Sequence, residues 1–553
     1  GVYAATIDVN FGQKPFKFTP PAGFQPLNGA NVKLDTVVGI NPDQFVGATL
    51  YSGTGSTKSV TGVGHSPDLL WVKARGHSDY HTLVDSVRGT SKTLYSNAAD
   101  SEGTDATGVT SFDRDGFSLG ANSTAGSVNV SGRSYVAWSW KAGGSKGTFN
   151  VDDVGYANAS DVGMNVGGQN SNAYDQSQTW SNSFTSSNGF ISASYDATKA
   201  FDGTPSGNHS GSNSSGTLTF TPNLTIPANS VIEGYFGSGS TTYMDVTING
   251  VANNSTPGGE FVKVNYNGST TLTSLTIYRT GGGNSADLRG IKINGKLLVD
   301  SGVTPPSVPS IAATGASVGT KQGFSIIKYT GTGSNASVPH GLQNIPKFII
   351  VKDRDSNSGW WSVYHHSMGN THALYLNDDQ SKVDSSFWND TTPTSSVFTI
   401  GANANTNSSN DFIAYLWHDV PGLQKFGSYE GNSSANGPFV ELGFKPAIIL
   451  LKNADDGSNR HWCIVDGTRT SFNKSASAEV LFADDSQVES YANNDYGQFG
   501  SKPCVDILSN GFKVREGDTS GVYTQTNRSD TIIYCAWAEA PTFNLFGGQS
   551  NAH

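Results

Sequence analysis

The stretch Pro67-Asp-Leu-Leu-Trp-Val-Lys73 recurs twice further along the chain, as Pro346-Lys-Phe-Ile-Ile-Val-Lys352 and as Pro446-Ala-Ile-Ile-Leu-Leu-Lys452. Each copy is followed downstream by an apolar run that ends in tryptophan, and these runs are Tyr135-Val-Ala-Trp-Ser-Trp140, Phe412-Ile-Ala-Tyr-Leu-Trp417 and Ile532-Ile-Tyr-Cys-Ala-Trp537. A fixed pair of anchors around a middle of variable length is typical of repeated folding units that carry loop insertions. The sequence therefore predicts three related modules.

Each lysine-terminated run is too short for a helix and is rich in Ile, Val and Leu, so it predicts a strand that is buried on both faces. The lysine is expected to mark the point where the strand meets water, with its stem covering apolar surface. The tryptophan-terminated run is expected to pair with this strand or to face it. Six tryptophans are predicted to be structural core residues: Trp71, Trp140, Trp361, Trp417, Trp462 and Trp537.

The composition favours strands and turns over helices. Charged residues make up only 14% of the 553 residues, aromatic residues 11%, and glycine alone contributes 66 residues. Gly, Ser and Asn are weak helix formers. The predicted fold class is therefore all-β, built of tandem antiparallel β-sandwich modules of the jelly-roll or concanavalin-like kind.

Charge and hydropathy exclude several classes of partner. The net charge is −11 and no Lys/Arg run is dense enough to neutralise a phosphate backbone, so nucleic acid is not an expected partner. No apolar run approaches the roughly 20 residues that span a bilayer, which predicts no membrane insertion. No signal peptide is visible. The first residue is Gly1, which predicts a processed product or a piece of a longer polypeptide. The three cysteines are too few for a disulfide framework, and Cys463 and Cys535 are interpreted as small core residues.

Changes in composition along the chain predict the domain boundaries. The segment 178–302 alternates apolar and polar residues in short runs between turn clusters, which indicates an antiparallel jelly roll. The predicted organisation, in chain order, is an arm at 1–30, module A at 31–143, a connector at 144–177, the jelly roll at 178–302, a linker at 303–320, module B at 321–423, module C at 424–545 and a tail at 546–553. Modules B and C follow each other without a gap, so one alternative is that these two modules share a single core. The modules are expected to form a rigid rod.

Alignment of the copies places Asp85, His365 and Asp466 at the same position, just after a strand. Arg88 and Arg469 then follow at matching spacing. The favoured interpretation is a turn locked by an Asp–Arg contact, because Asp at turns usually bonds locally. The alternative is a polar site at the strand end.

Module B departs from this pattern and supplies candidates for ligand contact. It carries His365-His366, for which the alternative is an idle pair in a loop. Trp360 and Trp361 must face opposite sides of a strand, and Trp361 aligns with the core residue Trp462. Trp360 is therefore expected to point outward, as a platform for a sugar ring or a partner protein or else as a cap on the core. The predicted carbohydrate- or partner-binding residues are Trp360, His365, His366 and Tyr235.

The run Asp353-x-Asp355-x-Asn357-x-Gly359 has alternating oxygen ligands, like part of a calcium loop. It lacks the distal Glu and the flanking helices of an EF-hand, so a polar hairpin tip is the favoured interpretation. Calcium bound in a β-sandwich loop is the alternative. No other cofactor and no catalytic residue is predicted. A carboxylate pair at glycosidase spacing cannot be located from sequence alone.

Several motifs carry a resemblance to a known family. They are Tyr329-Thr-Gly-Thr-Gly-Ser334, His340-Gly-Leu342, Ile349-Ile-Val-Lys352, Phe426-Gly-Ser-Tyr-Glu-Gly-Asn432, Gly443-Phe-Lys-Pro446 and the stretch from Ala540 to Asn551. With these motifs the three copies resemble the repeat modules of virion tail proteins from marine bacteriophages, especially those that infect cyanobacteria. The opening arm resembles the last strands of a SPRY-like domain. The middle segment, with Ala197-Thr-Lys-Ala-Phe-Asp-Gly203 and Arg289-Gly-Ile-Lys-Ile-Asn-Gly295, resembles a galactose-binding-like jelly roll.

The resemblance implies a structural or receptor-binding protein of the virion, a tail fibre or other appendage assembled in the host cytoplasm. Its expected partners are other virion proteins and a host-surface glycan or receptor, and a homo-oligomer, guessed to be a trimer, is expected. The expected mechanism is multivalent weak binding, in which linked shallow sites reinforce one another. No enzymatic activity is expected. The alternatives are a polysaccharide depolymerase, a purely architectural virion or cell-surface protein, and a bacterial adhesin.

Overall fold

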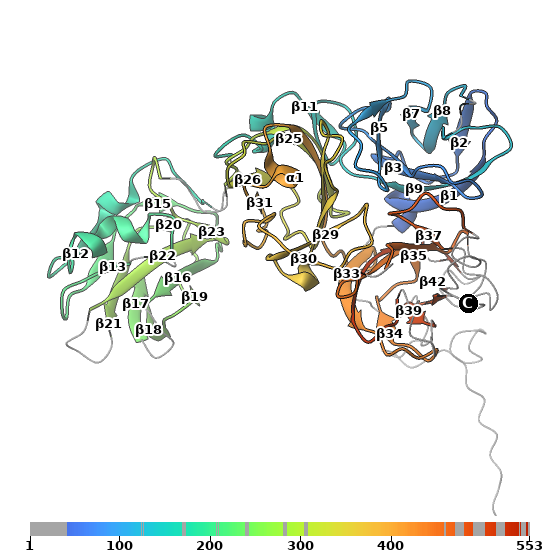
Figure 1. Ribbon diagram of the computed structural model, residues 1–553. Helices are drawn as coiled ribbons and strands as arrows, with labels where there is room; N and C mark the ends of the chain where they lie inside the picture. The colour runs from blue at the N-terminus through green and yellow to red at the C-terminus, as the bar shows by residue number, and fades with distance from the viewer. Residues whose placement is uncertain are drawn as a thin grey trace, which may run out of the picture. The chain divides into compact units, whose positions relative to one another are not determined.

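The computed structural model describes residues 41–122, 124, 126–168, 173–205, 207, 209–237, 243–279, 285–303, 308–457, 460–469, 480–489, 504–515, 526–540, 542–543 and 549–550. The predicted arm at 1–30, the first residues of module A and most of the predicted tail lie outside them. The described chain is all-β apart from 3₁₀ turns and one short helix, α1 (Ala404–Asn407). It divides into two compact units, one formed by 1–159 with 313–553 and the other by Ser160–Ala312 (Figure 1).

The first unit contains three modules with one strand order in their large sheets. In module A the order is β1 (Val46–Ser52), β9 (Ser134–Trp140), β3 (Leu69–Ala74), β4 (Thr82–Asp85), β5 (Lys92–Tyr95) and β6 (Gly103–Thr104). In module B the matching strands are β25 (Phe324–Thr330), β32 (Asp411–Trp417), β27 (Phe348–Asp353), β28 (Ser362–His365), β29 (His372–Tyr375) and β30 (Val383–Asp384). In module C they are β33 (Gln424–Glu430), β40 (Thr531–Ala538), β35 (Pro446–Asn453), β36 (Cys463–Asp466) and β37 (Leu481–Phe482).

A small sheet belongs to each module. These sheets are β2 (Lys58–Thr61), β8 (Gly116–Leu119) and β7 (Val109–Asp113) in module A, β26 (Ala336–Pro339) and β31 (Val397–Ile400) in module B, and β34 (Phe439–Glu441), β39 (Gly511–Val514) and β38 (Val505–Leu508) in module C. In module A, Leu70 and Val72 of β3 share a core with Phe117 of the small sheet. Module C has the same kind of core between its two sheets. This is the β-sandwich arrangement that the repeats predict.

The lysine-terminated runs are β3, β27 and β35, and each pairs antiparallel with its tryptophan-terminated strand. The pairing is in the same register in all three modules. It places Trp71 opposite Trp138, Ile350 opposite Tyr415 and Leu450 opposite Cys535. Ile, Val, Leu and Trp fill these strands because both of their faces are buried.

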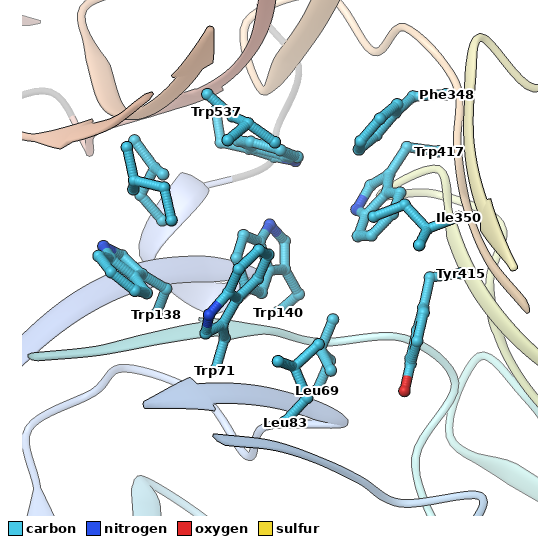
Figure 2. Close-up of a pocket in the computed structure, with 13 residues that line it drawn as sticks. Leu69, Trp71, Leu83, Trp138, Trp140, Phe348, Ile350, Tyr415, Trp417 and Trp537 are labelled. Atoms are coloured by element: carbon cyan, nitrogen blue, oxygen red, sulfur yellow. The ribbon is translucent and has the colours of Figure 1, made fainter. Parts of the chain in front are cut away.

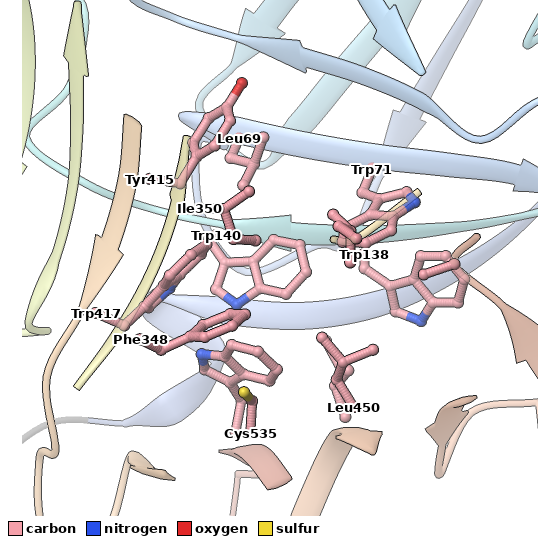
Figure 3. Close-up of a cluster of buried hydrophobic side chains, with 14 of the residues drawn as sticks. Leu69, Trp71, Trp138, Trp140, Phe348, Ile350, Tyr415, Trp417, Leu450 and Cys535 are labelled. Atoms are coloured by element: carbon pink, nitrogen blue, oxygen red, sulfur yellow. The ribbon is translucent and has the colours of Figure 1, made fainter. Parts of the chain in front are cut away.

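The other faces of the three large sheets meet in one common core. All six predicted core tryptophans are buried there, together with Trp138. Figure 2 shows Trp140, Trp417 and Trp537 gathered from modules A, B and C, and Figure 3 shows Leu69, Phe348 and Leu450 in the same cluster. The expected rod is wrong, since the modules close around a shared centre instead of following one another in a line.

Hydrogen bonds join each module to both of the others. They run from Trp361 Nε1 in module B to the Tyr95 carbonyl in module A (2.9 Å), from Trp462 Nε1 in module C to the Tyr375 carbonyl in module B (2.8 Å), and from Ser96 Oγ in module A to the Ala483 carbonyl in module C (2.7 Å). The three modules therefore form a closed ring within one chain.

The lysines that end the repeated strands do not meet water. Lys73, Lys352 and Lys452 are 0%, 0% and 1% exposed. Lys352 Nζ donates to the Ala99 carbonyl of module A at 3.2 Å, and Lys452 Nζ donates to the Asp379 carbonyl of module B at 2.8 Å. Ring closure covers the strand ends with loops of the neighbouring module, which corrects the sequence expectation.

These lysines are expected to make stability depend on pH. Burial lowers the pKa of Lys73, Lys352 and Lys452 from 10.5 to about 8. Between these values the unfolded chain binds more protons than the folded chain, so the free energy of unfolding rises with pH there, and the gain is absent below pH 8. From urea titrations between pH 8 and 9, we expect a smaller slope of stability against pH in Lys352→Met than in wild type.

The upper limit of the pH range and the choice of control variant both follow from the structure. Burial raises the pKa of the Cys535 thiol and of the Tyr415 hydroxyl, and these groups lower stability as pH rises further, which is why the comparison stops at pH 9. Lys296→Met alters an exposed lysine of the other unit and serves as the control with an unchanged slope. Equal slopes in Lys352→Met and wild type would contradict the burial argument.

The second unit, Ser160–Ala312, has its own hydrophobic core, which includes Trp180, Phe201 and Phe220. One sheet has the order β12 (Phe184–Ser186), β14 (Leu218–Phe220), β21 (Leu275–Arg279), β17 (Tyr243–Ile248) and β18 (Val251–Pro257). The other contains β13 (Ser210–Gly211), β22 (Asp287–Ile293), β16 (Ile232–Phe236), β19 (Phe261–Val264) and β23 (Lys296–Leu297), while β15 (Leu224–Thr225) pairs with β20 (Thr271–Leu272). The 3₁₀ turns of the second unit are Trp180–Ser183, Ala193–Tyr195 and Ala197–Ala200, and the turn Ala159–Val162 lies at its start. The first unit contains the 3₁₀ turns Pro42–Gln44 and His366–Met368 and the paired strands β41 (Thr542–Phe543) and β42 (Gln549–Ser550).

The chain leaves and re-enters the ring at one edge of the large sheet of module B. The hairpin β10 (Phe149–Val151) and β11 (Val154–Tyr156) extends the large sheet of module B, and β10 pairs in parallel with β24 (Ala313–Gly319). β24 falls inside the segment 303–320 that was predicted to be a linker. It pairs antiparallel with β25, so module B begins earlier in the chain than the predicted boundary at 321.

Candidate functional site

The four residues predicted to bind a sugar or a partner do not assemble into one site. Trp360 is half-buried and its ring lies against Tyr375, with centroids 4.3 Å apart at 63°. His365 is 0% exposed, which places it out of reach of a ligand. Half-buried His366 lies with Nε2 3.0 Å from a backbone carbonyl. Tyr235 belongs to the second unit, where its ring packs against Phe261 at 5.4 Å.

The aligned Asp–Arg pairs are buried and also connect modules. Asp85 Oδ2 accepts a hydrogen bond from Arg88 Nε at 2.5 Å and another from the Tyr415 hydroxyl of module B at 2.7 Å. Asp466 Oδ2 accepts from Arg469 Nε at 2.5 Å and from Trp138 Nε1 of module A at 2.9 Å. The turn-locking contact that the sequence favours is present, and the same carboxylates hold the ring together.

His365 fills the equivalent position at the third junction. The strand that faces it carries Cys535 where the other two carry Tyr415 and Trp138. A thiol is a weak donor, so a buried carboxylate there would lack the strong donor that its equivalents have. His365 Nε2 instead lies 3.3 Å from the Tyr534 carbonyl. Burial lowers the pKa of His365 to about 3, which keeps its imidazole neutral. His365 is thus a structural residue.

The predicted calcium ligands face hydrogen-bond donors of the protein. Asp353 Oδ1 accepts from the backbone N–H of Asp355 at 2.9 Å, and Asp353 Oδ2 accepts from Asn410 Nδ2 at 2.8 Å. Asp355 Oδ2 accepts from the N–H of Asp411, and Asn357 Oδ1 accepts from the N–H of Ser101. In the described part of the chain no group of three or more His, Cys, Asp or Glu residues could hold a metal ion. The run is the polar turn that the sequence favoured.

A polar cleft of about 430 Å³ lies in the first unit, where module A meets the two hairpin turns of β10–β11 and β24–β25. Its lining residues are Gln44, Phe45, Gly64, His65, Ser66, Arg114, Lys141, Ala142, Asp152, Asp153, Lys321 and Gln322. The β10–β11 turn consists of Asp152 and Asp153 with φ of +49° and +67°. A two-residue hairpin turn of type I′ has positive φ at both positions, and Asp tolerates it better than most residues. This turn places both carboxylates at the cleft.

The walls of the cleft are held in place by hydrogen bonds. Asp152 accepts from the N–H and hydroxyl of Thr320 at 2.9 and 2.6 Å, and Asp153 Oδ1 accepts from Lys141 Nζ at 2.7 Å. Gln322 Nε2 donates to the Ala142 carbonyl at 2.6 Å. Lys141, Ala142 and the two turns are therefore fixed relative to one another, which gives the cleft a preformed shape.

His65 forms a neutral part of the cleft wall. Its Nδ1 lies 2.7 Å from the Asp43 carbonyl and its Nε2 lies 3.1 Å from Ser139 Oγ. Burial lowers the pKa of His65 to about 4, because the charged ring would lose its hydration. The histidine is already engaged and uncharged, so it serves as a structural residue here.

Two exposed cations, Arg114 and Lys321, complete the cleft. Within the described ranges neither takes part in an ion pair. Half-buried Phe45 supplies an apolar surface beside them. Donors on Arg114, Lys141 and Lys321, acceptors on the two aspartates and one aromatic ring make a set that suits a ligand rich in hydroxyl groups.

Sequence reasoning missed this cleft because its residues come from separate segments. Asp152 and Asp153 lie in what was predicted to be a connector, and Lys321 lies at a predicted domain boundary. One signal was available: Lys141 follows directly after Trp140, the repeated anchor. A charged residue next to a buried strand end marks a rim where polar groups gather.

Comparisons with known proteins give a family and two partial likenesses. The family model described as "Domain of unknown function (DUF7483)" matches residues 41–167 and 301–541. The f-lectin (fucolectin) from striped bass (Morone saxatilis) serum is 10% identical over 44% of this chain and 93% of that chain, with a TM-score of 0.18. A truncated AlyQ with CBM32 and alginate lyase domains is 9% identical over 64% of this chain and 95% of that chain, with a TM-score of 0.17. No curated protein matches. Among the described residues there is no helix with the length and hydropathy needed to cross a membrane.

Proposed function

The chain belongs to the family described as domain of unknown function (DUF7483), and within this family we propose that it is a glycan-binding protein of a bacteriophage tail fibre or similar virion appendage. The proposed ligand is a saccharide unit of a bacterial surface polymer. The proposed site is the polar cleft that Phe45, Arg114 and Lys321 line with the Asp152–Asp153 turn. The proposal of a virion setting rests on the resemblance of the repeated sequence motifs to those of phage tail proteins.

The observation that carries the binding proposal is the combination of a preformed cleft and two cations without ion-pair partners in the described part of the chain. Exposed cations that protein carboxylates do not neutralise remain free to donate to a ligand. Each hydroxyl of a sugar both donates and accepts, so it pairs with the cations and with Asp153 at the same time. The C–H face of a sugar ring packs on an aromatic surface such as Phe45.

Binding rather than catalysis is proposed because the candidate proton-transfer groups of the cleft are already engaged. Asp152 accepts two hydrogen bonds from Thr320, Asp153 pairs with Lys141, and His65 is held neutral. A general acid or base must reach the substrate with a free proton site. Attachment would gain strength from several copies of the chain on one virion, because the second contact is then intramolecular.

Replacing Arg114 or Lys321 with alanine is expected to weaken glycan binding by about tenfold each, the effect of removing one hydrogen bond to a charged donor. A glycan array of neutral and acidic bacterial surface saccharides identifies the ligand, and calorimetry on the intact chain measures its affinity. Lys58→Ala changes a lysine on β2, outside the lining of the cleft, and is the matched control with unchanged affinity.

Two results would count against the proposal. A ligand found on the array that binds Arg114→Ala and Lys321→Ala as tightly as wild type would place the site elsewhere. Shortened glycan chains after incubation with the protein would instead favour a depolymerase.

A further inference from the structure

Arg114 of the polar cleft lies in the turn between β7 and β8, next to two carboxylates that are both engaged elsewhere. Asp113 accepts hydrogen bonds from two serine hydroxyls at 2.8 and 2.6 Å. Asp115 accepts from the backbone N–H groups of Gly62 and Gly64 at 3.0 and 2.7 Å. The acidic groups closest to Arg114 in sequence are therefore held by uncharged donors, and in the described part of the chain the guanidinium enters no ion pair.

Lys321, the second exposed cation of the cleft, is in the same situation. It lies in the turn between β24 and β25, directly after Thr320. The carboxylate of Asp152 accepts from the N–H and the hydroxyl of Thr320, at 2.9 and 2.6 Å. Asp153 Oδ1 lies 2.7 Å from Lys141 Nζ, so this carboxylate is paired with a different lysine. Neither aspartate of the cleft therefore neutralises Lys321.

The charge of the cleft lining is opposite in sign to that of the whole chain. The lining contains one arginine, two lysines and two aspartates, which leaves an excess of one positive charge. His65 adds none, because burial lowers its pKa to about 4. The chain as a whole carries a net charge of −11. A cleft that differs in sign from the surrounding surface attracts ligands of one charge, here anions.

Cations without a partner distinguish an acidic saccharide from a neutral one. A sugar hydroxyl can accept a hydrogen bond from a guanidinium or ammonium group, but it does not neutralise the charge. A carboxylate or sulfate substituent does both, and such charge-assisted hydrogen bonds are about twice as strong as neutral ones. The planar guanidinium of Arg114 also matches two oxygens of one anionic group. Asp152 and Asp153, which could repel that group, already accept hydrogen bonds from the protein.

We propose that the saccharide bound in the polar cleft is acidic, and that its anionic substituent pairs with Arg114 and Lys321. This inference rests on the proposed function and names the class of saccharide that the same site takes. The uncharged part of the sugar then faces Phe45 and the pair formed by Lys141 and Asp153. Because the chain is acidic overall, an acidic polymer gains little from the rest of the surface, so the cleft determines where the polymer binds.

An array that carries each acidic bacterial oligosaccharide beside its own neutral form tests the proposal on the full chain. Carboxyl reduction neutralises uronic acids and desulfation neutralises sulfated sugars, while the linkages stay the same. We expect the acidic form to bind at least about tenfold more tightly than its neutral form. The treatment that removes this difference identifies the anionic group. Added salt should narrow the difference, because it screens the charges at the cleft.

The variants Arg114→Gln and Lys321→Gln assign the preference to the cleft. Glutamine keeps N–H donors and removes the positive charge. The affinity for the neutral form should therefore change little, while the preference for the acidic form should fall by about tenfold in each variant. Lys58→Gln is the matched control, because it removes a lysine of β2 that lies outside the cleft lining, and it should keep the full preference. Circular dichroism verifies that the three variants fold.

The possible results separate this inference from the function on which it rests. Equal binding of acidic and neutral forms, with both weakened in Arg114→Ala and Lys321→Ala, would overturn the acidic ligand and leave the glycan site in place. A preference for acidic forms that persists in both glutamine variants would also overturn it, because the anionic group would then bind elsewhere. An array without any ligand whose affinity depends on these two cations would overturn both proposals.

Discussion

Replacing Trp417 with alanine is expected to lower the free energy of unfolding by about 3–5 kcal/mol, the usual cost of deleting a large buried aromatic side chain. Trp417 is 2% exposed and stacks on Phe324 and Phe348 of its own module, with centroids 4.5 and 5.3 Å away. It also meets Trp140 and Trp537 of the other two modules. The cavity left by alanine would lie at the meeting point of three rigid sheets, which have little freedom to collapse into it.

Urea denaturation followed by near-ultraviolet circular dichroism measures this effect. Trp360→Ala is the comparison, because Trp360 is half-buried at the edge of module B and its loss should cost clearly less. The second unit has a separate core, so its transition should stay in place in both variants. A Trp417→Ala protein as stable as wild type would mean that the three sheets do not share a core in solution.

Removing the carboxylate of Asp85 is expected to cost about 3–5 kcal/mol, because it leaves a buried charge without its partner. The side chains of Asp85 and Arg88 are both 0% exposed. Arg88 Nη1 lies 3.6 Å from a Glu102 oxygen, so part of its charge stays compensated and the lower end of the range is expected. The same substitution leaves the Tyr415 hydroxyl of module B without its acceptor.

A double-mutant cycle of Asp85→Ala with Tyr415→Phe separates the contact between modules from the contact within the turn. A hydrogen bond to a charged acceptor contributes about 1.5–3 kcal/mol, and the coupling energy should fall in this range. Additive effects, with a coupling below about 0.5 kcal/mol, would show that Tyr415 and Asp85 act independently. The cycle therefore measures directly how strongly module B is joined to module A.

The strands and the core tryptophans could be predicted from sequence because they repeat. Residues that must pair and pack recur in the same order, as Trp71, Ile350 and Leu450 do opposite their partners in the three large sheets. The closure of the ring could not be predicted from these patterns alone. A strand buried on both faces needs two covers, and the small sheet described in each module covers one of these faces. The second cover comes from the other modules.

Two other expectations failed for a related reason. Lys352 looks like a strand end in water when its module is considered alone, and it is buried only because a loop of module A covers it. His365 looks like a candidate ligand contact until the opposing Cys535 is placed. The cleft was missed because Arg114, Asp153 and Lys321 are far apart in sequence and each fits an ordinary turn or loop. Contacts between modules, which leave no periodic trace in the sequence, decide all of these cases.

The ring is continuous without the second unit, Ser160–Ala312, because β24 pairs in parallel with β10 on one side and antiparallel with β25 on the other. The polypeptide departs after β11 and returns on β24, and these two strands flank β10 in the sheet of module B. A short bridge could therefore close the gap without disturbing a ladder of that sheet. The family model likewise matches residues 41–167 and 301–541 and leaves out the residues between them. The second unit is thus an insertion that shares no described sheet with the three modules, so its loss would leave their strand pairing unchanged.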